Sequence, residues 1–108
     1  MMRLALYPNI RVKLGGLGMQ VCGAKFNTKS KPPTSDHLCD LWRPWIFETI
    51  DLFGIERCMF ESNFPVDKEC VSYRTLWNFF KKISIEMNLS KADKDKVFSE
   101  TAKLVYRL

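Results

Sequence analysis

The chain has 108 residues, of which 46% are hydrophobic and 13% aromatic. This length predicts one domain, and the apolar content is sufficient for a core, which excludes a disordered composition. The formal net charge is +5, but basic and acidic residues are interleaved along both halves of the chain. A nucleic-acid-binding domain usually gathers its positive charge on one face or arm, so this pattern favours a solvated surface and no nucleic-acid partner.

The sequence predicts neither a membrane span nor an export signal. No run approaches the roughly 18 consecutive apolar residues of a membrane span, and the apolar run before Pro8 is too short for a signal peptide. We therefore expect no membrane partner and a cytoplasmic location. In that compartment the four cysteines would stay reduced, namely Cys22, Cys39, Cys58 and Cys70.

The first third of the chain predicts a helix end, a strand and a long loop. Residues 3–7 resemble the last turn of a helix that stops at Pro8, a first hint that the chain is part of a larger domain. Residues 10–14 alternate apolar and basic side chains, as a strand does, and the glycine cluster at 15–18 ends it. Residues 19–35 sustain no period, and a loop of this length usually binds or covers something.

The middle of the chain predicts helical structure followed by a strand. A helix capped by Ser35 or Asp36 carries apolar residues at helical spacing: Leu38, Leu41, Trp42, Trp45, Ile46, Ile50 and Phe53. Pro44 lacks an amide hydrogen and clashes with the preceding turn, so we expect a break at Arg43 and two short helices. The apolar run at 58–60 does not alternate, which predicts a strand covered on both faces.

The last third predicts two further helices. The first carries a wide apolar stripe made of Tyr73, Leu76, Trp77, Phe80 and Ile83, with Lys81 and Lys82 on the opposite side. The second begins at Ser90, which forms a pattern like a capping box with Asp93, and continues to the terminus through Val97, Thr101, Leu104, Val105 and Leu108. Strands separated by helices predict a parallel α/β arrangement, here mostly helical by residue count. Two strands alone do not complete a sheet.

Three candidate sites have a plainer structural explanation. The glycine cluster at 15–18 is not followed by the helix that a phosphate loop needs, which favours a tight backbone turn. His37 and Cys39 are close in sequence, but the other cysteines are isolated, which favours buried thiols over zinc and a surface or capping role for His37. The helical spacing of the large aromatic residues favours a core over a ligand pocket: Trp42, Trp45, Trp77, Phe79 and Phe80.

The strongest functional candidate is the polar cluster that follows the strand at 58–60. Glu61, Ser62, Asn63 and Asp67 stand at a strand end, where α/β proteins place functional groups. Two interpretations stay open. Either these side chains meet a ligand, or Ser62 and Asn63 only bond the backbone of the turn that follows.

Several motifs extend this cluster over the whole chain. They are RVKLGGLGM at 11–19, WRPWI at 42–46, FGIERCMFESNFPVD at 53–67, TA at 101–102 and VYRL at 105–108. In this order they resemble the C-terminal part of the amidohydrolase-related family, TIM-barrel hydrolases that include sugar and dicarboxylate lactonases. The resemblance implies that residues 1–108 are a C-terminal fragment of such a domain. It implies an α/β fold, a partial (β/α)8 barrel with about the last two β/α units, because a whole barrel needs about 250 residues.

The resemblance also implies roles for the strand-end residues. In the family the last strand ends in a Gly-Ser-Asp-Trp-Pro-like motif whose aspartate is a metal ligand or the general base, and the matching residue here is Asn63. An amide cannot act as a base, so proton abstraction would pass to Glu61 or Asp67 or be absent. Lys13 would pair with a substrate carboxylate or oxyanion, with a solvated lysine as the alternative, and Ser62 would contact the substrate.

The activity implied by the resemblance is hydrolysis of a lactone or similar cyclic ester or amide, a small-molecule substrate. In the family, histidines on earlier strands bind a divalent metal, zinc or similar, or the substrate. This chain lacks those strands, so we expect no cofactor in this chain and no activity of the chain alone. The alternative is a non-catalytic truncated domain that self-associates as a homo-oligomer, or binds a partner protein, through exposed sheet edges.

Overall fold

Two short parallel strands lie at the centre of the fold. The structure is a computed structural model, and it describes residues 1–19, 22–23, 25–26 and 30–108. Strand β1 (Val12–Leu14) pairs with β2 (Cys58–Phe60), and Lys13 lies opposite Met59. Because side chains alternate along a strand, Leu14, Cys58 and Phe60 face one side of the pair and Lys13 and Met59 face the other. Leu14, Cys58 and Phe60 join the main apolar core, which is consistent with this division.

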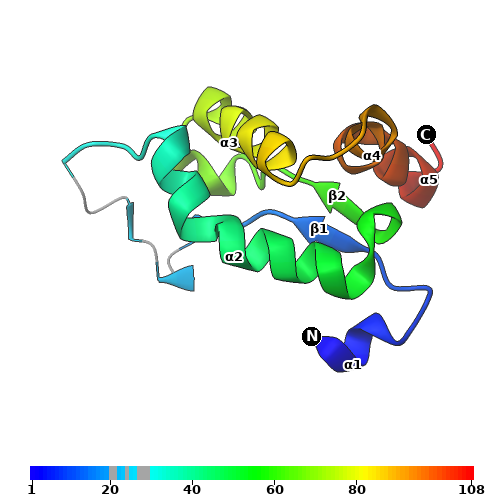
Figure 1. The fold of residues 1–108 in the computed structure, drawn as a ribbon. Coiled ribbons are helices and arrows are strands. Elements are labelled where there is room, and N and C mark those ends of the chain that lie inside the picture. The colour runs from blue at the N-terminus through cyan, green and yellow to red at the C-terminus, as the bar shows by residue number, and fades with distance from the viewer. Residues whose placement is uncertain (20–21, 24, 27–29) are drawn as a thin grey trace.

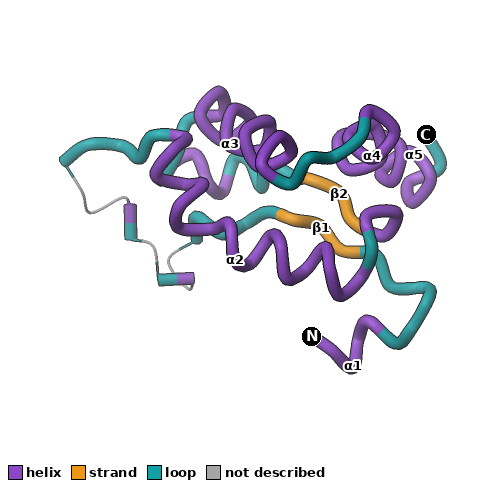
Figure 2. Tube along the Cα trace, viewed as in Figure 1, coloured by secondary structure: helices purple, strands orange, loops and turns teal. Residues whose placement is uncertain are grey.

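Helices account for most of the remaining described residues, as Figures 1 and 2 show. In chain order the helical elements are α1 (Met2–Ala5), α2 (Ser35–Phe53), η3 (Ile55–Arg57), η4 (Val66–Glu69), α3 (Tyr73–Glu86), α4 (Lys91–Asp95), the π-helical turn η5 (Lys96–Glu100) and α5 (Thr101–Tyr106). The two strands are therefore joined by a crossover that contains α2, and the elements that follow β2 in the described residues are all helical. The predicted mostly helical α/β arrangement is confirmed.

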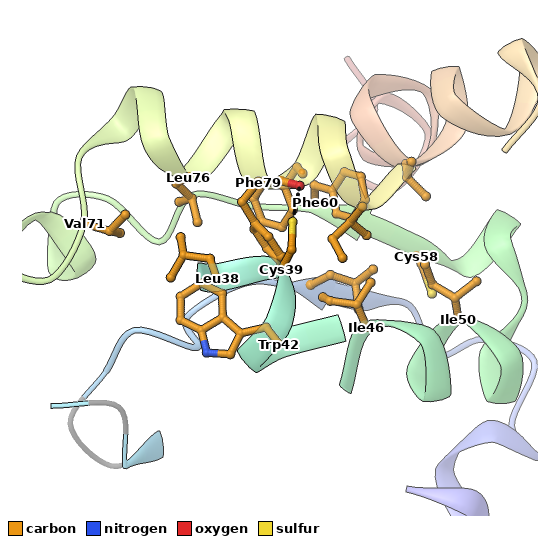
Figure 3. Packing of buried hydrophobic residues seen from close by; sticks show 14 of the residues in the cluster. Leu38, Cys39, Trp42, Ile46, Ile50, Cys58, Phe60, Val71, Leu76 and Phe79 are labelled. Carbon is orange, nitrogen blue, oxygen red and sulfur yellow. Dashed lines mark hydrogen bonds between the residues drawn. The ribbon is translucent and has the colours of Figure 1, made fainter. Parts of the chain in front are cut away.

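The core lies between α2, α3 and one face of the strand pair (Figure 3). Helix α2 contributes a buried stripe at helical spacing, and α3 contributes Leu76, Phe79, Phe80 and Ile83. The ring of Trp42 meets the ring of Phe79 edge to face at 5.3 Å. On the strand side, Phe60 stacks on Phe80 with the ring centroids 4.4 Å apart. Aromatic contacts thus connect α2 to α3 and α3 to β2.

The predicted break at Arg43 is wrong, because α2 runs without interruption from Ser35 to Phe53 with Pro44 inside it. Pro44 lies on the exposed side of the helix. Trp42 and Ile46, two positions before and after Pro44, are both buried in the core. Burial on both sides of the proline outweighs the single hydrogen bond that the proline removes.

Part of the predicted apolar stripe of α2 is also wrong. Trp45 and Leu41 are exposed, at 59% and 42%, whereas Trp42 is buried. These two side chains flank the buried stripe and line a surface groove with Leu17. The cap of α2 differs by one residue from the prediction, since the hydroxyl of Thr34 accepts the hydrogen bond from the amide of His37.

The other elements agree with the sequence except at their ends and in the last helical segment, where α5 ends at Tyr106 and Leu104, Val105 and Leu108 are exposed. The strand predicted at 10–14 is limited to Val12–Leu14, and the helical turn at the N-terminus covers Met2–Ala5. The predicted cap is confirmed, because the hydroxyl of Ser90 accepts from the amide of Asp93. Tyr73, predicted in the apolar stripe of α3, is 56% exposed. Of the predicted loop at 19–35, residues 20–21, 24 and 27–29 lie outside the described residues.

Two arginines join elements that are distant in sequence. The guanidinium of Arg43 on α2 donates to both carboxylate oxygens of Glu86 at the end of α3. The guanidinium of Arg57 donates to the backbone carbonyls of Ala5 and Tyr7, each at 3.0 Å, and so ties α1 to the start of β2.

Within the described ranges, no helix is both long enough and apolar enough to cross a membrane.

Candidate active site at the strand ends

The carboxyl ends of β1 and β2 lie side by side, and the segments that follow them come into contact. The last register pair is Leu14 with Phe60, and the amide of Glu61 continues the ladder by donating to the carbonyl of Leu14 at 3.3 Å. The glycine cluster therefore lies beside the polar residues that follow β2. This is the edge at which parallel α/β sheets place functional groups.

Lys13 and Glu61 form an ion pair across this edge. The ammonium Nζ of Lys13 lies 2.7 Å from Oε2 of Glu61, and their side chains are 51% and 25% exposed. The pKa of Lys13 is raised above its ordinary value because Glu61 accepts its hydrogen bond and attracts its charge, with a smaller contribution from Tyr106. The structure thus brings together the predicted substrate-binding lysine and one predicted catalytic carboxylate, with the lysine in its charged form and half open to solvent.

Asn63 and Asp67 form a second side-chain pair at this edge. The side-chain amide of Asn63 donates to Oδ1 of Asp67 at 2.9 Å, and the backbone amide of Gly18 also donates to this carboxylate. Asp67 is 1% exposed. Burial raises the pKa of Asp67 above its ordinary value, although the hydrogen bonds from Asn63 and Gly18 oppose this. Asp67 is therefore an acid held by two donors and not a group open to solvent.

Ser62 supports the turn after β2. Its hydroxyl accepts a hydrogen bond from the backbone amide of Phe64 at 3.3 Å. Ser62 thus makes the backbone contact that the turn interpretation predicts, and its predicted contact with a substrate stays a prediction. For Asn63 the structure shows a different contact, since its side chain bonds to Asp67 while its backbone adopts a positive φ of 55°.

Gly15 is a residue of this edge whose specific role the sequence did not reveal. A Cβ atom at this position would lie 2.2 Å from Cγ of Glu61 and 2.4 Å from its carbonyl oxygen. Only glycine lets the end of β1 approach the backbone of Glu61 this closely. The tight turn predicted for the cluster is confirmed, with Gly16 at a φ of 73° and a hydrogen bond from the amide of Met19 to the carbonyl of Gly16.

We expect Gly15→Ala to destabilise the chain by about 1–3 kcal/mol, because the added methyl group overlaps the backbone of Glu61. Urea unfolding measures the change. Gly23→Ala is the control, since a Cβ there meets nothing within 4 Å and only the positive φ of 83° is strained. A Gly15→Ala protein as stable as the parent would mean that the two strand ends are not in this close contact.

The described strand-end residues do not suit a divalent metal ion. The carboxylate of Glu61 is paired with Lys13, and the carboxylate of Asp67 is buried against Asn63 and Gly18. Cys58 begins β2 at the opposite end of the strand and belongs to the core, where burial raises the pKa of its thiol to about 11 and disfavours the thiolate that zinc prefers. Across the described ranges, no group of three or more His, Cys, Asp or Glu residues is placed to hold a metal.

Comparison with known proteins identifies the family. A family model described as amidohydrolase matches residues 1–108. The chain belongs to the amidohydrolase family, and the strand-end polar residues lie within the matched range.

One curated relative matches over the whole chain. It is an uncharacterized protein of Sinorhizobium fredii, y4mH, which is 39% identical over 108 residues. The match covers 100% of this chain but 31% of the relative, so the chain spans about a third of the relative's length. No solved structure matches the chain significantly.

Proposed function

We propose that this chain supplies the last two β/α units of a (β/α)8 barrel hydrolase that acts on a lactone or a similar cyclic ester or amide. The observation that carries the proposal is the ion pair of Lys13 and Glu61 at the carboxyl ends of two parallel strands. Membership of the amidohydrolase family supports the hydrolase class. The lactone extends the family resemblance, whereas the cytoplasmic location, which is also part of this proposal, extends the prediction of no export signal.

The geometry favours Glu61 as the proton acceptor of this proposed reaction. Asn63 has no basic group, and Asp67 is buried with its carboxylate occupied, whereas the side chain of Glu61 is partly exposed. Water attacks the carbonyl carbon of the substrate, and the carboxylate of Glu61 takes the proton of that water. The ammonium of Lys13 stabilises the oxyanion that forms, and the ring C–O or C–N bond breaks as the leaving atom takes a proton.

Two proteins test the proposal. The first is the 108-residue chain alone, which we expect to be inactive. The second is a chimera in which this chain replaces the matching segment of the Sinorhizobium fredii relative, which supplies the rest of a longer protein. We expect the chimera to hydrolyse at least one member of a panel of sugar lactones, dicarboxylate lactones and cyclic amides, assayed with and without Zn²⁺.

A matched chimera that carries Glu61→Gln controls for background hydrolysis, since it removes the proposed base and retains the shape of the side chain. A folded chimera without activity on the whole panel, or equal activity in the Glu61→Gln chimera, contradicts the proposal.

A second candidate function rests on the strand edges. Within the described ranges, β1 and β2 pair only with each other, so each strand keeps one edge free of strand partners. Large apolar side chains are also exposed, including Leu6 at 81% and Leu104 at 69%. Both features support a non-catalytic domain that self-associates or binds a partner protein. Sedimentation equilibrium of the purified chain tests this, because a monomer at all concentrations would contradict self-association.

A further inference from the structure

The carboxylate of Asp67 joins the segments that follow the two strands. Its first donor, the side-chain amide of Asn63 at 2.9 Å, belongs to the segment after β2. Its second donor, the backbone amide of Gly18, belongs to the turn after β1. Asp67 itself is 1% exposed, so its carboxylate depends on these donors and not on solvent for hydrogen bonds. A buried carboxylate with two donors is a strong polar contact, and its loss would leave those donors unpaired.

This arrangement needs a donor at position 63 and an acceptor at position 67. Asparagine supplies the donor, and a carboxylate at position 63 could not. Two carboxylates within 3 Å of each other repel, and this repulsion raises the pKa of one of them. An aspartate at position 63 would therefore conflict with the buried acid four residues later.

We propose that positions 63 and 67 form one acid–amide pair, in which Asn63 is a positioning residue for Asp67. The acid and the amide of this pair can exchange places, but an acid at both positions destabilises the chain. This inference concerns the stability of the strand end, and it rests on the proposed function only in treating that end as part of an active site. In this chain the acid lies buried at position 67, and the exchange places it at the partly exposed position 63.

The exchange satisfies every group in the contact. In Asn63→Asp/Asp67→Asn, the amide nitrogen at position 67 donates to the carboxylate at position 63. The carbonyl oxygen at position 67 still accepts from the backbone amide of Gly18. In the single variant Asn63→Asp, the same two sites hold two carboxylates and one proton between them, or suffer repulsion.

A stability cycle on the 108-residue chain tests the pair. Urea unfolding at pH 7 compares the parent, Asn63→Asp, Asp67→Asn and the double variant. We expect Asn63→Asp to raise the unfolding equilibrium constant by about tenfold or more, because two adjacent carboxylates differ in pKa by at least about one unit. We expect the double variant to return to within about threefold of the parent, since its contacts are complete.

Asn88→Asp is the matched control. Asn88 is an exposed asparagine that also has a positive φ, 53° against 55° at Asn63. The same chemical change is thus made at a similar backbone conformation without a buried acid beside it. We expect the new charge near the C-terminal end of α3 to raise the unfolding equilibrium constant by only about threefold.

The pH dependence separates repulsion from a simple loss of packing. As the pH falls from about 7 to about 5, one carboxyl of the Asn63→Asp variant binds a proton and can donate to the other, so the deficit relative to the parent shrinks. Glu61 is the other acid that acts on Asp67, and all four proteins retain it. A packing defect would not respond to pH in this way.

The inference is overturned if Asn63→Asp is as stable as the parent at pH 7, or if the double variant is no more stable than Asn63→Asp. If Asn63→Asp does not fold, the double variant decides, because a folded double variant supports the pair and an unfolded one refutes it. The cycle measures stability and needs no activity. Failure of rescue therefore refutes the pair, whereas an inactive chimera refutes the proposed function.

Discussion

Phe60→Ala is expected to destabilise the chain by about 3–5 kcal/mol, the cost of removing a buried phenylalanine from a packed core. Phe60 is 6% exposed. Its ring stacks on Phe80 of α3 at 4.4 Å and meets Phe98 of η5 edge to face at 5.0 Å. A single side chain of β2 thus contacts two of the helical segments that follow it, α3 and η5, and alanine would lose both contacts and leave a cavity.

The measurement is thermal and urea unfolding. For a domain of this size the loss corresponds to a fall in melting temperature of at least about 12 °C, and it approaches the total stability of a marginal domain. Phe60→Leu should cost less, since it retains most of the volume. Tyr7→Ala is the control for loss of an aromatic ring, because Tyr7 is 59% exposed, and we expect a change within about 0.5 kcal/mol. A Phe60→Ala protein with the parent's stability would show that the helices do not pack on β2 in this way.

The elements that local patterns determine could be predicted from the sequence. The apolar run at 58–60 is buried along its whole length, and Ser90 caps its helix as the pattern indicated. Pro44 shows where local rules fail. Its cost to the helix is local, but the burial of Trp42 and Ile46 that offsets this cost depends on residues far away in the chain. No propensity of residues 40–48 carries that information.

Only part of the candidate site could be predicted from the sequence, because its contacts also depend on residues far away in the chain. The residues Glu61, Asn63 and Asp67 could be selected from their position after a strand. Their partners could not, because Lys13 and Gly18 are more than 40 residues away, and only the register of β1 against β2 brings them together. The sequence therefore predicted a group of candidate acids. The structure divides them into an exposed ion pair and a buried acid–amide pair.

Lys13→Met is the change with the largest expected effect on the proposed activity. Methionine retains the length of the apolar stem but removes the charge, so packing at the edge is conserved while the donor to the oxyanion is lost. In the chimera we expect kcat/KM to fall by about 100-fold, the effect of removing one oxyanion donor from a site of this kind. Steady-state kinetics on the substrate found in the lactone panel measure the change.

Two further variants define the role of this lysine. Lys13→Arg retains the charge with a different shape, and we expect it to recover part of the activity. Ser62→Ala removes only the bond to the amide of Phe64 and should cost far less than Lys13→Met. If Lys13→Met and Ser62→Ala lower kcat/KM equally, or if Lys13→Met has no effect, Lys13 is a solvated lysine of the edge and not a catalytic residue.

The raised pKa of Lys13 gives a check that needs no substrate. Glu61 is its main cause, so Glu61→Gln should bring the pKa of Lys13 down toward the ordinary value of 10.5, measured by NMR titration of the lysine side chain in the 108-residue chain. A lysine whose folded-state pKa is raised stabilises the fold below its ordinary pKa, and this contribution is lost as the pH rises through the raised value. The difference in stability between the parent and Glu61→Gln should therefore be present at neutral pH and vanish above the raised pKa. A difference that persists there would mean that Glu61 stabilises the strand ends through something other than the charge of Lys13.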